Sequence, residues 1–200
     1  MPAISSVTVY AGSSRRAPPE LLDLARALGC GIAEQGWTLV YGGAQVGLMG
    51  ALADGALAAG GRVEGVLLDT FARVAHAGLH TLETVGDMRT RKASLAHRGD
   101  AYVVLPGGLG TLEEFAEILV ERQLGLHARP LVLVDYCGFW QPLLAQFDAQ
   151  LRSGFVTEHD RASLEVVTDA RAALEHLRRA ATSPDAGEAG SSGAPGDPRG

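Results

Sequence analysis

The chain has 200 residues, of which 46% are hydrophobic and 20% charged, and this suits one domain with a substantial core. Its formal net charge of −6 argues against nucleic acid as the main partner. No apolar stretch reaches the roughly 18 residues of a membrane span, and the N-terminus lacks the pattern of a signal peptide, so we expect a cytoplasmic protein with no membrane partner.

Short β-rich runs alternate with helical segments along most of the chain. The expected strands cover residues 7–10, 38–41, 62–68, 79–85, 101–105, 130–135 and 164–167. The expected helices cover residues 18–35, 47–59, 88–98, 111–126, 139–152 and 169–180, and residues 69–78 read as irregular. Such alternation predicts an α/β fold: a single Rossmann-like, doubly wound domain whose mostly parallel sheet of about seven strands carries helices on both faces.

The end of the chain differs in composition from the rest. From residue 182 onward it consists largely of Gly, Ser, Pro, Asp and Ala without periodicity. Segments of this kind lack the apolar residues needed to bury a core. We therefore predict one domain over residues 1–181 and a disordered tail over residues 182–200.

The most informative segment is Leu105-Pro-Gly-Gly-Leu-Gly-Thr-Leu-Glu-Glu114, which follows an apolar run and opens a helix. A glycine-rich turn at a helix N-terminus presents free backbone N–H groups, which suit a phosphate. A carboxylate one turn further on indicates a site that also acts on the phosphorylated ligand. A structural interpretation fits as well, because Thr111 and Glu114 have the spacing of a capping box. Taken alone, the segment leaves both interpretations open.

Three Gly- or Ser-containing loops follow predicted strands, at residues 11–14, 42–50 and 106–111. In an open α/β sheet they would share the edge where ligands bind. None has the dinucleotide-binding G-x-G-x-x-G pattern, and no Gly-Lys-Ser/Thr of a P-loop occurs. Cys30 and Cys137 are isolated and form no metal-ligand pair. We therefore expect no dinucleotide cofactor, no P-loop nucleotide and no metal.

Four basic residues stand between Asp87 and Asp100 with no acid among them: Arg89, Arg91, Lys92 and Arg98. They form either a solvated helix face or an anion site. Arg91 lies near an apolar stripe at the start of a predicted helix, where a cation is unfavourable by roughly 0.3–1 kcal/mol. A bound anion would explain that placement.

The carboxylates of the following helix divide into two groups. Glu113, Glu117 and Glu121 recur every four residues and predict a solvated stripe. Glu114 is offset from this stripe, beside apolar residues such as Phe115 and Ile118. Glu114 is therefore the carboxylate expected to face the site.

These residues together resemble a known family. Pro106-Gly-Gly-Leu-Gly-Thr-Leu-Glu-Glu114 is similar to the PGGxGTxxE motif of the LONELY GUY phosphoribohydrolases, often mislabelled "lysine decarboxylase-like". Arg91-Lys92 after Met88 looks like their second motif, and the segments at residues 12–14, 41–50 and 123–127 also match. The resemblance implies hydrolysis of the N-glycosidic bond of cytokinin riboside 5′-monophosphates, and of AMP by many members, to the free base and ribose 5-phosphate.

The resemblance also implies roles for individual residues. Arg91 and Glu114 would be the catalytic pair, with Arg91 either binding phosphate or offsetting charge on the departing base. The implied contacts to the substrate and its phosphate are Ser13, Ser14, Gly42, Gly43, Met88, Lys92, Gly107, Gly108, Leu109, Gly110, Thr111 and Glu113. Family members need no organic cofactor and form homodimers or larger assemblies, for which helices 47–59 and 111–126 would supply surface.

The sequence departs from the family pattern at Leu68, Arg73, Arg89, Thr90, Leu109, Glu121 and Arg122. These differences do not affect the residues expected to cleave the bond. They leave two alternatives for the preferred base of the substrate, prenylated adenine and a plain purine.

A second hypothesis is a non-catalytic nucleotide or molybdopterin carrier on a related fold. A carrier shares glycine-rich phosphate loops but has no need of Arg91 together with Glu114, so their joint presence favours the enzyme. A pyridoxal-dependent lysine decarboxylase is disfavoured, because the single lysine, Lys92, lies in the basic cluster rather than at a Schiff-base site.

Overall fold

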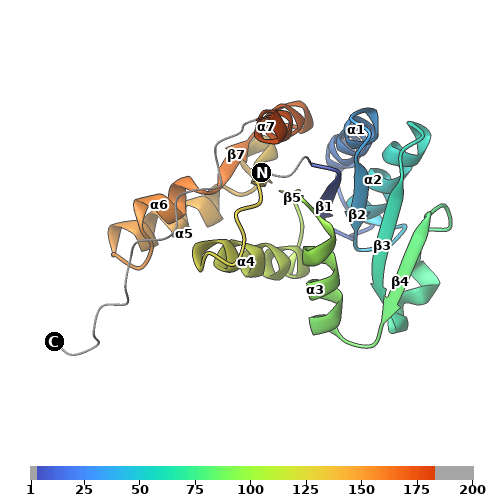
Figure 1. The fold of residues 1–200 in the computed structure, drawn as a ribbon, viewed down its shortest axis with the longest axis horizontal. Coiled ribbons are helices and arrows are strands. Elements are labelled where there is room, and N and C mark those ends of the chain that lie inside the picture. The colour runs from blue at the N-terminus through green and yellow to red at the C-terminus, as the bar shows by residue number, and fades with distance from the viewer. Residues whose placement is uncertain (1–3, 183–200) are drawn as a thin grey trace.

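A seven-stranded sheet in the order β4-β3-β2-β1-β5-β6-β7 forms the centre of the computed structural model, which describes residues 4–182 (Figure 1). Every strand pair in it is parallel. The strands are β1 (Ser6–Tyr10), β2 (Thr38–Tyr41), β3 (Val63–Leu68), β4 (Thr81–Val85), β5 (Ala101–Val104), β6 (Leu131–Val134) and β7 (Glu165–Val167).

Helices cover both faces of this sheet (Figure 1). Residues of α1, α2 and α7 pack in one apolar cluster and residues of α3, α4 and α5 in the other, so each set covers its own face. The α-helices are α1 (Pro19–Glu34), α2 (Gly47–Ala58), α3 (Met88–Arg98), α4 (Leu109–Gln123), α5 (Gln141–Arg152), α6 (Glu158–Ala162) and α7 (Ala170–Thr182). The predicted Rossmann-like α/β fold is confirmed.

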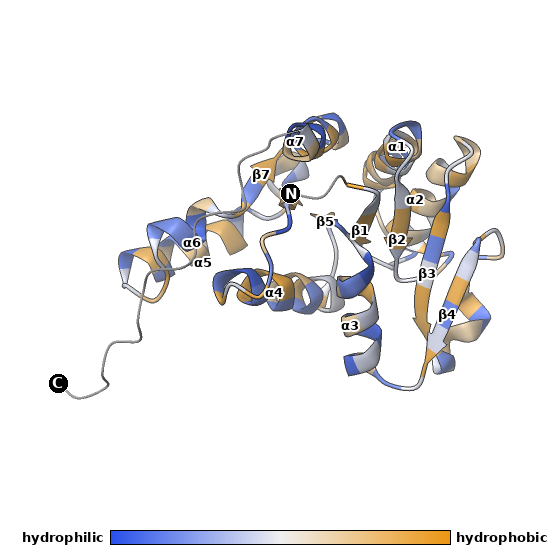
Figure 2. Ribbon diagram, viewed as in Figure 1, coloured by the Kyte–Doolittle hydropathy of each residue, from blue (hydrophilic) through white to orange (hydrophobic). Residues whose placement is uncertain are grey.

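The inner strands are apolar along their whole length because both of their faces are covered. All four residues of β5 and all four of β6 are buried, as expected for the interior of a parallel sheet. Figure 2 shows the contrast with α3, which is coloured mostly blue and pale and has only Arg91 and Leu95 buried. Arg91 is therefore unusual, as a cation on the inward side of a polar helix.

The sheet reverses its direction of growth at β1, whose neighbours are β2 and β5. Loops that leave the carboxyl ends of strands at such a switch point diverge and open a crevice for ligands. At its base the two loops touch, since Gly12 N–H donates to the Pro106 carbonyl at 3.1 Å. The sheet topology thus places the loops after β1 and β5 at the expected ligand site.

Some local expectations need correction. The sequence reading missed α6, although Thr157 and Asp160 form the capping box that starts it. The irregular stretch 69–78 contains the 3-10 helix η1 (Asp69–Val74), and Ala75 pairs with Ala44 in an isolated bridge. Thr182 ends α7, and residues 183–200 of the predicted tail lie outside the described residues. Within residues 4–182, no helix has the length and apolar character needed to cross a bilayer.

Candidate active site

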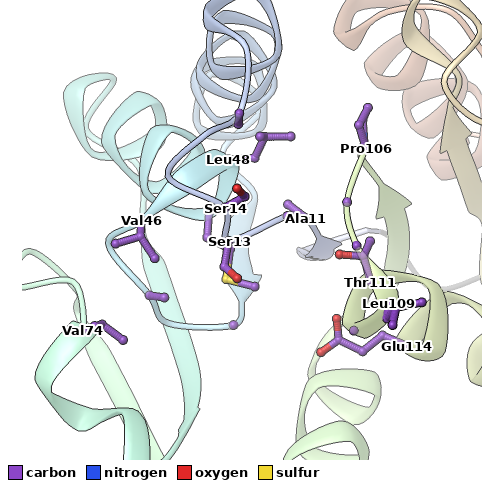
Figure 3. Close-up of a pocket in the computed structure, with 18 of the residues that line it drawn as sticks. Ala11, Ser13, Ser14, Val46, Leu48, Val74, Pro106, Leu109, Thr111 and Glu114 are labelled. Atoms are coloured by element: carbon purple, nitrogen blue, oxygen red, sulfur yellow. The ribbon is translucent and has the colours of Figure 1, made fainter.

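A cavity of about 750 Å³ lies at the carboxyl ends of the central strands. The loops after β1, β2 and β5 border it, together with the end of β3, η1 and the first turns of α3 and α4. Figure 3 shows the Glu114 carboxylate and the Thr111 hydroxyl directed across this cavity towards the loop that carries Ser13. Its size is within the range of small-molecule sites.

The glycine-rich segment starts α4 earlier than the sequence suggested. The helix begins at Leu109 with Gly108 as its N-cap residue, and no side chain caps it. Thr111 is therefore the third helical residue and Glu114 the sixth, too far along the helix to form the capping box. The structural interpretation of this pair is wrong, and another partner must account for Glu114.

That partner is Arg91. Its Nη1 donates to Glu114 Oε1 at 2.6 Å, and its Nε donates to the Val66 carbonyl at 3.1 Å. Both residues are buried, with 8% of Arg91 and 5% of Glu114 exposed. A Cβ atom at Gly42 would lie 2.5 Å from Arg91 Nη2, so a larger residue there would displace the guanidinium. The ion pair thus fixes the guanidinium against β2 and β3 and holds the carboxylate at the cavity wall.

The surroundings of Glu114 act on its titration in opposite directions. Burial raises the pKa of this carboxyl above its usual value, and the guanidinium of Arg91 offsets part of that increase. Perturbed titratable groups in clefts are candidates for functional residues. The arrangement therefore provides a desolvated carboxylate held in one orientation.

The other predicted cation of this helix has a different role. Lys92 Nζ lies 2.8 Å from a Glu113 carboxylate oxygen and 3.1 Å from one of Glu117. These contacts raise the pKa of Lys92. The Glu113 and Glu117 side chains are 54% and 41% exposed, as expected of a solvated stripe, and both also neutralise Lys92. The carboxylates of Glu113 and Glu117 on α4 therefore supply part of the negative charge that balances the basic residues of α3.

The structure brings most of the predicted site residues together around the cavity. Those that line it are Ser13, Ser14, Gly42, Met88, Arg91, Gly107, Gly108, Leu109, Gly110, Thr111 and Glu114. Gly43, Lys92 and Glu113 are outside its lining. Gly43 instead faces Leu82 and Leu67, which lie within 3.3 Å of the position that a Cβ atom would take.

Sequence reasoning missed two parts of the cavity wall. One is an apolar surface formed by Met49, Leu67, Leu68, Phe71 and Val74. The other includes Arg16 and Phe139, from the loop before α1 and the start of the turn before α5. Leu67 and Leu68 end β3 and the other residues follow strands of the sheet, so the same edge rule that identified the glycine-rich loops pointed to them, although only Met49 belongs to a segment with a recognised pattern.

Comparisons with known proteins show which family the chain resembles. A family model described as "Possible lysine decarboxylase" matches residues 49–177. The chain is 42% identical over 180 residues to a cytokinin riboside 5′-monophosphate phosphoribohydrolase of Rhodococcoides fascians, which spans 88% of this chain and 91% of that protein. It is 38% identical over 171 residues to a protein of the same name from Mycobacterium tuberculosis, with coverage of 84% and 91%.

Solved structures support the fold. The molybdenum cofactor binding protein of Rippkaea orientalis aligns with a TM-score of 0.71 at 24% identity, over 88% of this chain and 97% of that one. The molybdenum cofactor carrier protein of Chlamydomonas reinhardtii aligns with a TM-score of 0.64 at 23% identity, over 87% and 96%. At these identities the likeness shows a shared fold.

Proposed function

Because the chain belongs to the family of cytokinin riboside 5′-monophosphate phosphoribohydrolases, we propose that it hydrolyses the N-glycosidic bond of a purine or cytokinin riboside 5′-monophosphate. Water adds its hydroxyl to C1′ of the ribose and its proton to the base, giving the free base and ribose 5-phosphate. The observation that carries this proposal is the buried Arg91–Glu114 pair at 2.6 Å, beside the glycine-rich start of α4.

The two members of the pair have separate tasks in this reaction. Cleavage of an N-glycoside passes through a state with positive charge on the ribose ring. The Glu114 carboxylate stabilises that charge, and its burial strengthens the interaction because little water competes. Arg91 is held at Nη1 by Glu114 and at Nε by Val66. It positions the carboxylate and leaves Nη2, beside Gly42, to contact the ligand.

The base belongs on the apolar side of the cavity. Leu67, Leu68, Phe71 and Met88 line that side, and an uncharged purine or prenylated adenine suits apolar walls. Thr90, one of the departures from the family pattern, is turned to its own helix start, where its N–H and hydroxyl donate to the Asp87 carboxylate. Base preference therefore depends on the cavity wall rather than on Thr90.

The carrier hypothesis has less support. Its known representatives share the fold at under 25% identity, and a carrier would gain nothing from a desolvated carboxylate at the ligand. Replacing a buried ion pair by apolar residues of similar volume is often neutral or stabilising, so a role in chemistry explains the pair inside a binding cavity better than a role in stability.

AMP is expected to be hydrolysed while adenosine reacts much more slowly. The start of α4 and its glycine N–H groups bind an anion, so removal of the phosphate removes the anchor that orients the ribose. The measurement is release of free adenine from each compound at equal concentration. Equal rates on the two would contradict the phosphate anchor. Isopentenyladenosine 5′-monophosphate, assayed alongside, reports the preference for a prenylated base.

We also propose that the protein is a homodimer, with the C-terminal end of α4 at the interface. Val120, Leu124 and Leu126 are exposed there by 49%, 68% and 71%. Seven of the twelve residues of α2 are buried, so we place the interface on α4 rather than on α2.

Light scattering at micromolar concentration is expected to give a dimer for the wild type and a monomer for a Leu124→Glu, Leu126→Glu variant. Ala58→Glu, on the exposed side of α2, is the matched control and should remain dimeric. A monomeric wild type would refute the proposed dimer, and it would not contradict the proposed reaction.

A further inference from the structure

The cavity holds one cation that has no carboxylate partner. Among the described residues that line it, the ionisable ones are Arg16, Arg91 and Glu114. Arg91 and Glu114 neutralise each other at 2.6 Å, and Lys92 lies outside the lining, bound by Glu113 and Glu117. Arg16 is exposed and its side chain forms no ion pair with any residue in the range 4–182. The net positive charge of the cavity therefore comes from Arg16.

The start of α4 provides the complementary part of an anion site. No side chain caps this 15-residue helix, so its first N–H groups lack protein acceptors. The Thr111 side chain is 4% exposed and its hydroxyl has no hydrogen-bond partner within the described part of the chain. Figure 3 shows that hydroxyl directed into the cavity. The residue is buried but its hydroxyl oxygen is open to the cavity, so it is free to donate to a bound oxyanion.

The backbone brings the loop of Arg16 next to this helix start. Gly12 N–H donates to the Pro106 carbonyl, and a Cβ atom at Gly12 would lie 3.1 Å from Gly107 Cα. Further along the loop, the Ser14 hydroxyl accepts the Arg16 N–H at 3.1 Å. This turn lies just ahead of α1, and it fixes the backbone of Arg16, which lines the cavity.

The positive charge that binds the phosphate therefore comes from a residue other than Arg91 and Lys92, the cations that the sequence pattern suggested. A 5′-phosphate carries up to two negative charges, and α4 supplies about half a positive charge at its N-terminus. Arg91 and Lys92 are already paired with carboxylates. We propose that Arg16 binds the 5′-phosphate of the substrate, together with the Thr111 hydroxyl and the N–H groups at the start of α4. This assignment rests on the proposed function, whose site it completes.

Arg16→Ala is expected to raise KM for AMP by roughly 10- to 100-fold, the usual effect of losing a charge-assisted hydrogen bond to phosphate. The kcat should change little, because the contact is present in both the bound substrate and the transition state. The kcat/KM for adenosine should stay the same, and Arg16→Lys should recover part of the loss by restoring the charge.

Arg15→Ala is the matched control. Arg15 is the neighbouring residue, is also exposed, and lines a separate hollow with Arg26 and Asp54 rather than this cavity. Its substitution removes the same charge from the same loop and should leave KM for AMP unchanged. An equal rise of KM in both variants, or no rise in Arg16→Ala, would overturn the assignment of Arg16.

Binding of ribose 5-phosphate, measured by calorimetry, separates failure of this inference from failure of the proposed function. Weaker binding by Arg16→Ala, but not by Arg15→Ala, supports the phosphate site even if the wild type hydrolyses no AMP. Equal binding by the wild type and Arg16→Ala refutes the role of Arg16 even if hydrolysis is observed.

Discussion

Glu114→Gln is expected to lower kcat for AMP by a factor on the order of 10²–10³, equivalent to roughly 3–4 kcal/mol of transition-state stabilisation. The amide keeps the size of the side chain and an oxygen acceptor for Arg91 Nη1, which now lies 2.6 Å from the carboxylate. It removes the negative charge that faces the ribose. Binding of AMP should change far less, because the glycine-rich start of α4 is unaltered.

Stability and pH dependence are the two controls for this variant. Loss of a charged hydrogen bond should lower the free energy of unfolding by about 1–3 kcal/mol, so the protein remains folded. In the wild type, burial raises the pKa of Glu114, and activity should fall as decreasing pH protonates the carboxylate. This acid limb should start above the range of an ordinary glutamate and be absent in Glu114→Gln. A folded, fully active variant would show that Glu114 is only structural.

Arg91→Lys is expected to lose most of the kcat/KM for AMP, by a factor on the order of 10² or more. Arginine donates from Nε to Val66 and from Nη1 to Glu114 at the same time. A lysine has a single nitrogen and no planar fork, so it holds the carboxylate without fixing its orientation. Steady-state kinetics measures the loss, and thermal unfolding shows whether the fold survives.

Arg98→Lys on the same helix is the matched control for the substitution. Arg98 contacts Glu64 and Glu83 at 2.8 Å, at the C-terminal end of α3 and outside the cavity lining. The same chemical change there should leave kcat/KM close to the wild-type value. Wild-type kinetics in Arg91→Lys would show that the orientation of Glu114 is not controlled by Arg91.

The fold was predictable because its signals are local. A short apolar run such as the one in β5 is typical of a strand covered on both faces, and alternation with helices favours a parallel sheet. The short helix α6 was missed because five residues give no periodicity, although its Thr157–Asp160 capping box was present in the sequence. The burial of α2 was missed because it depends on packing against α1, which no local pattern reports.

The site was predictable only in part. The offset of Glu114 from the stripe of Glu113, Glu117 and Glu121 indicated an inward carboxylate, and it is buried. The partners of the cations were not predictable, because Lys92 meets Glu113 and Glu117 across two helices that the sequence cannot place. Arg16 lies outside the recognised motifs. It stands out as the cation of the cavity without a carboxylate partner only when the partners of the other cations are known.

Product analysis of AMP incubated with the protein tests the proposed reaction most directly. Adenine and ribose 5-phosphate should appear in equal amounts, with no inorganic phosphate and no adenosine, and their formation should slow by a factor on the order of 10²–10³ in Glu114→Gln. AMP that binds but is recovered unchanged would contradict the enzyme and favour a carrier. Adenosine with inorganic phosphate would show that the phosphate ester, rather than the N-glycosidic bond, is the point of attack.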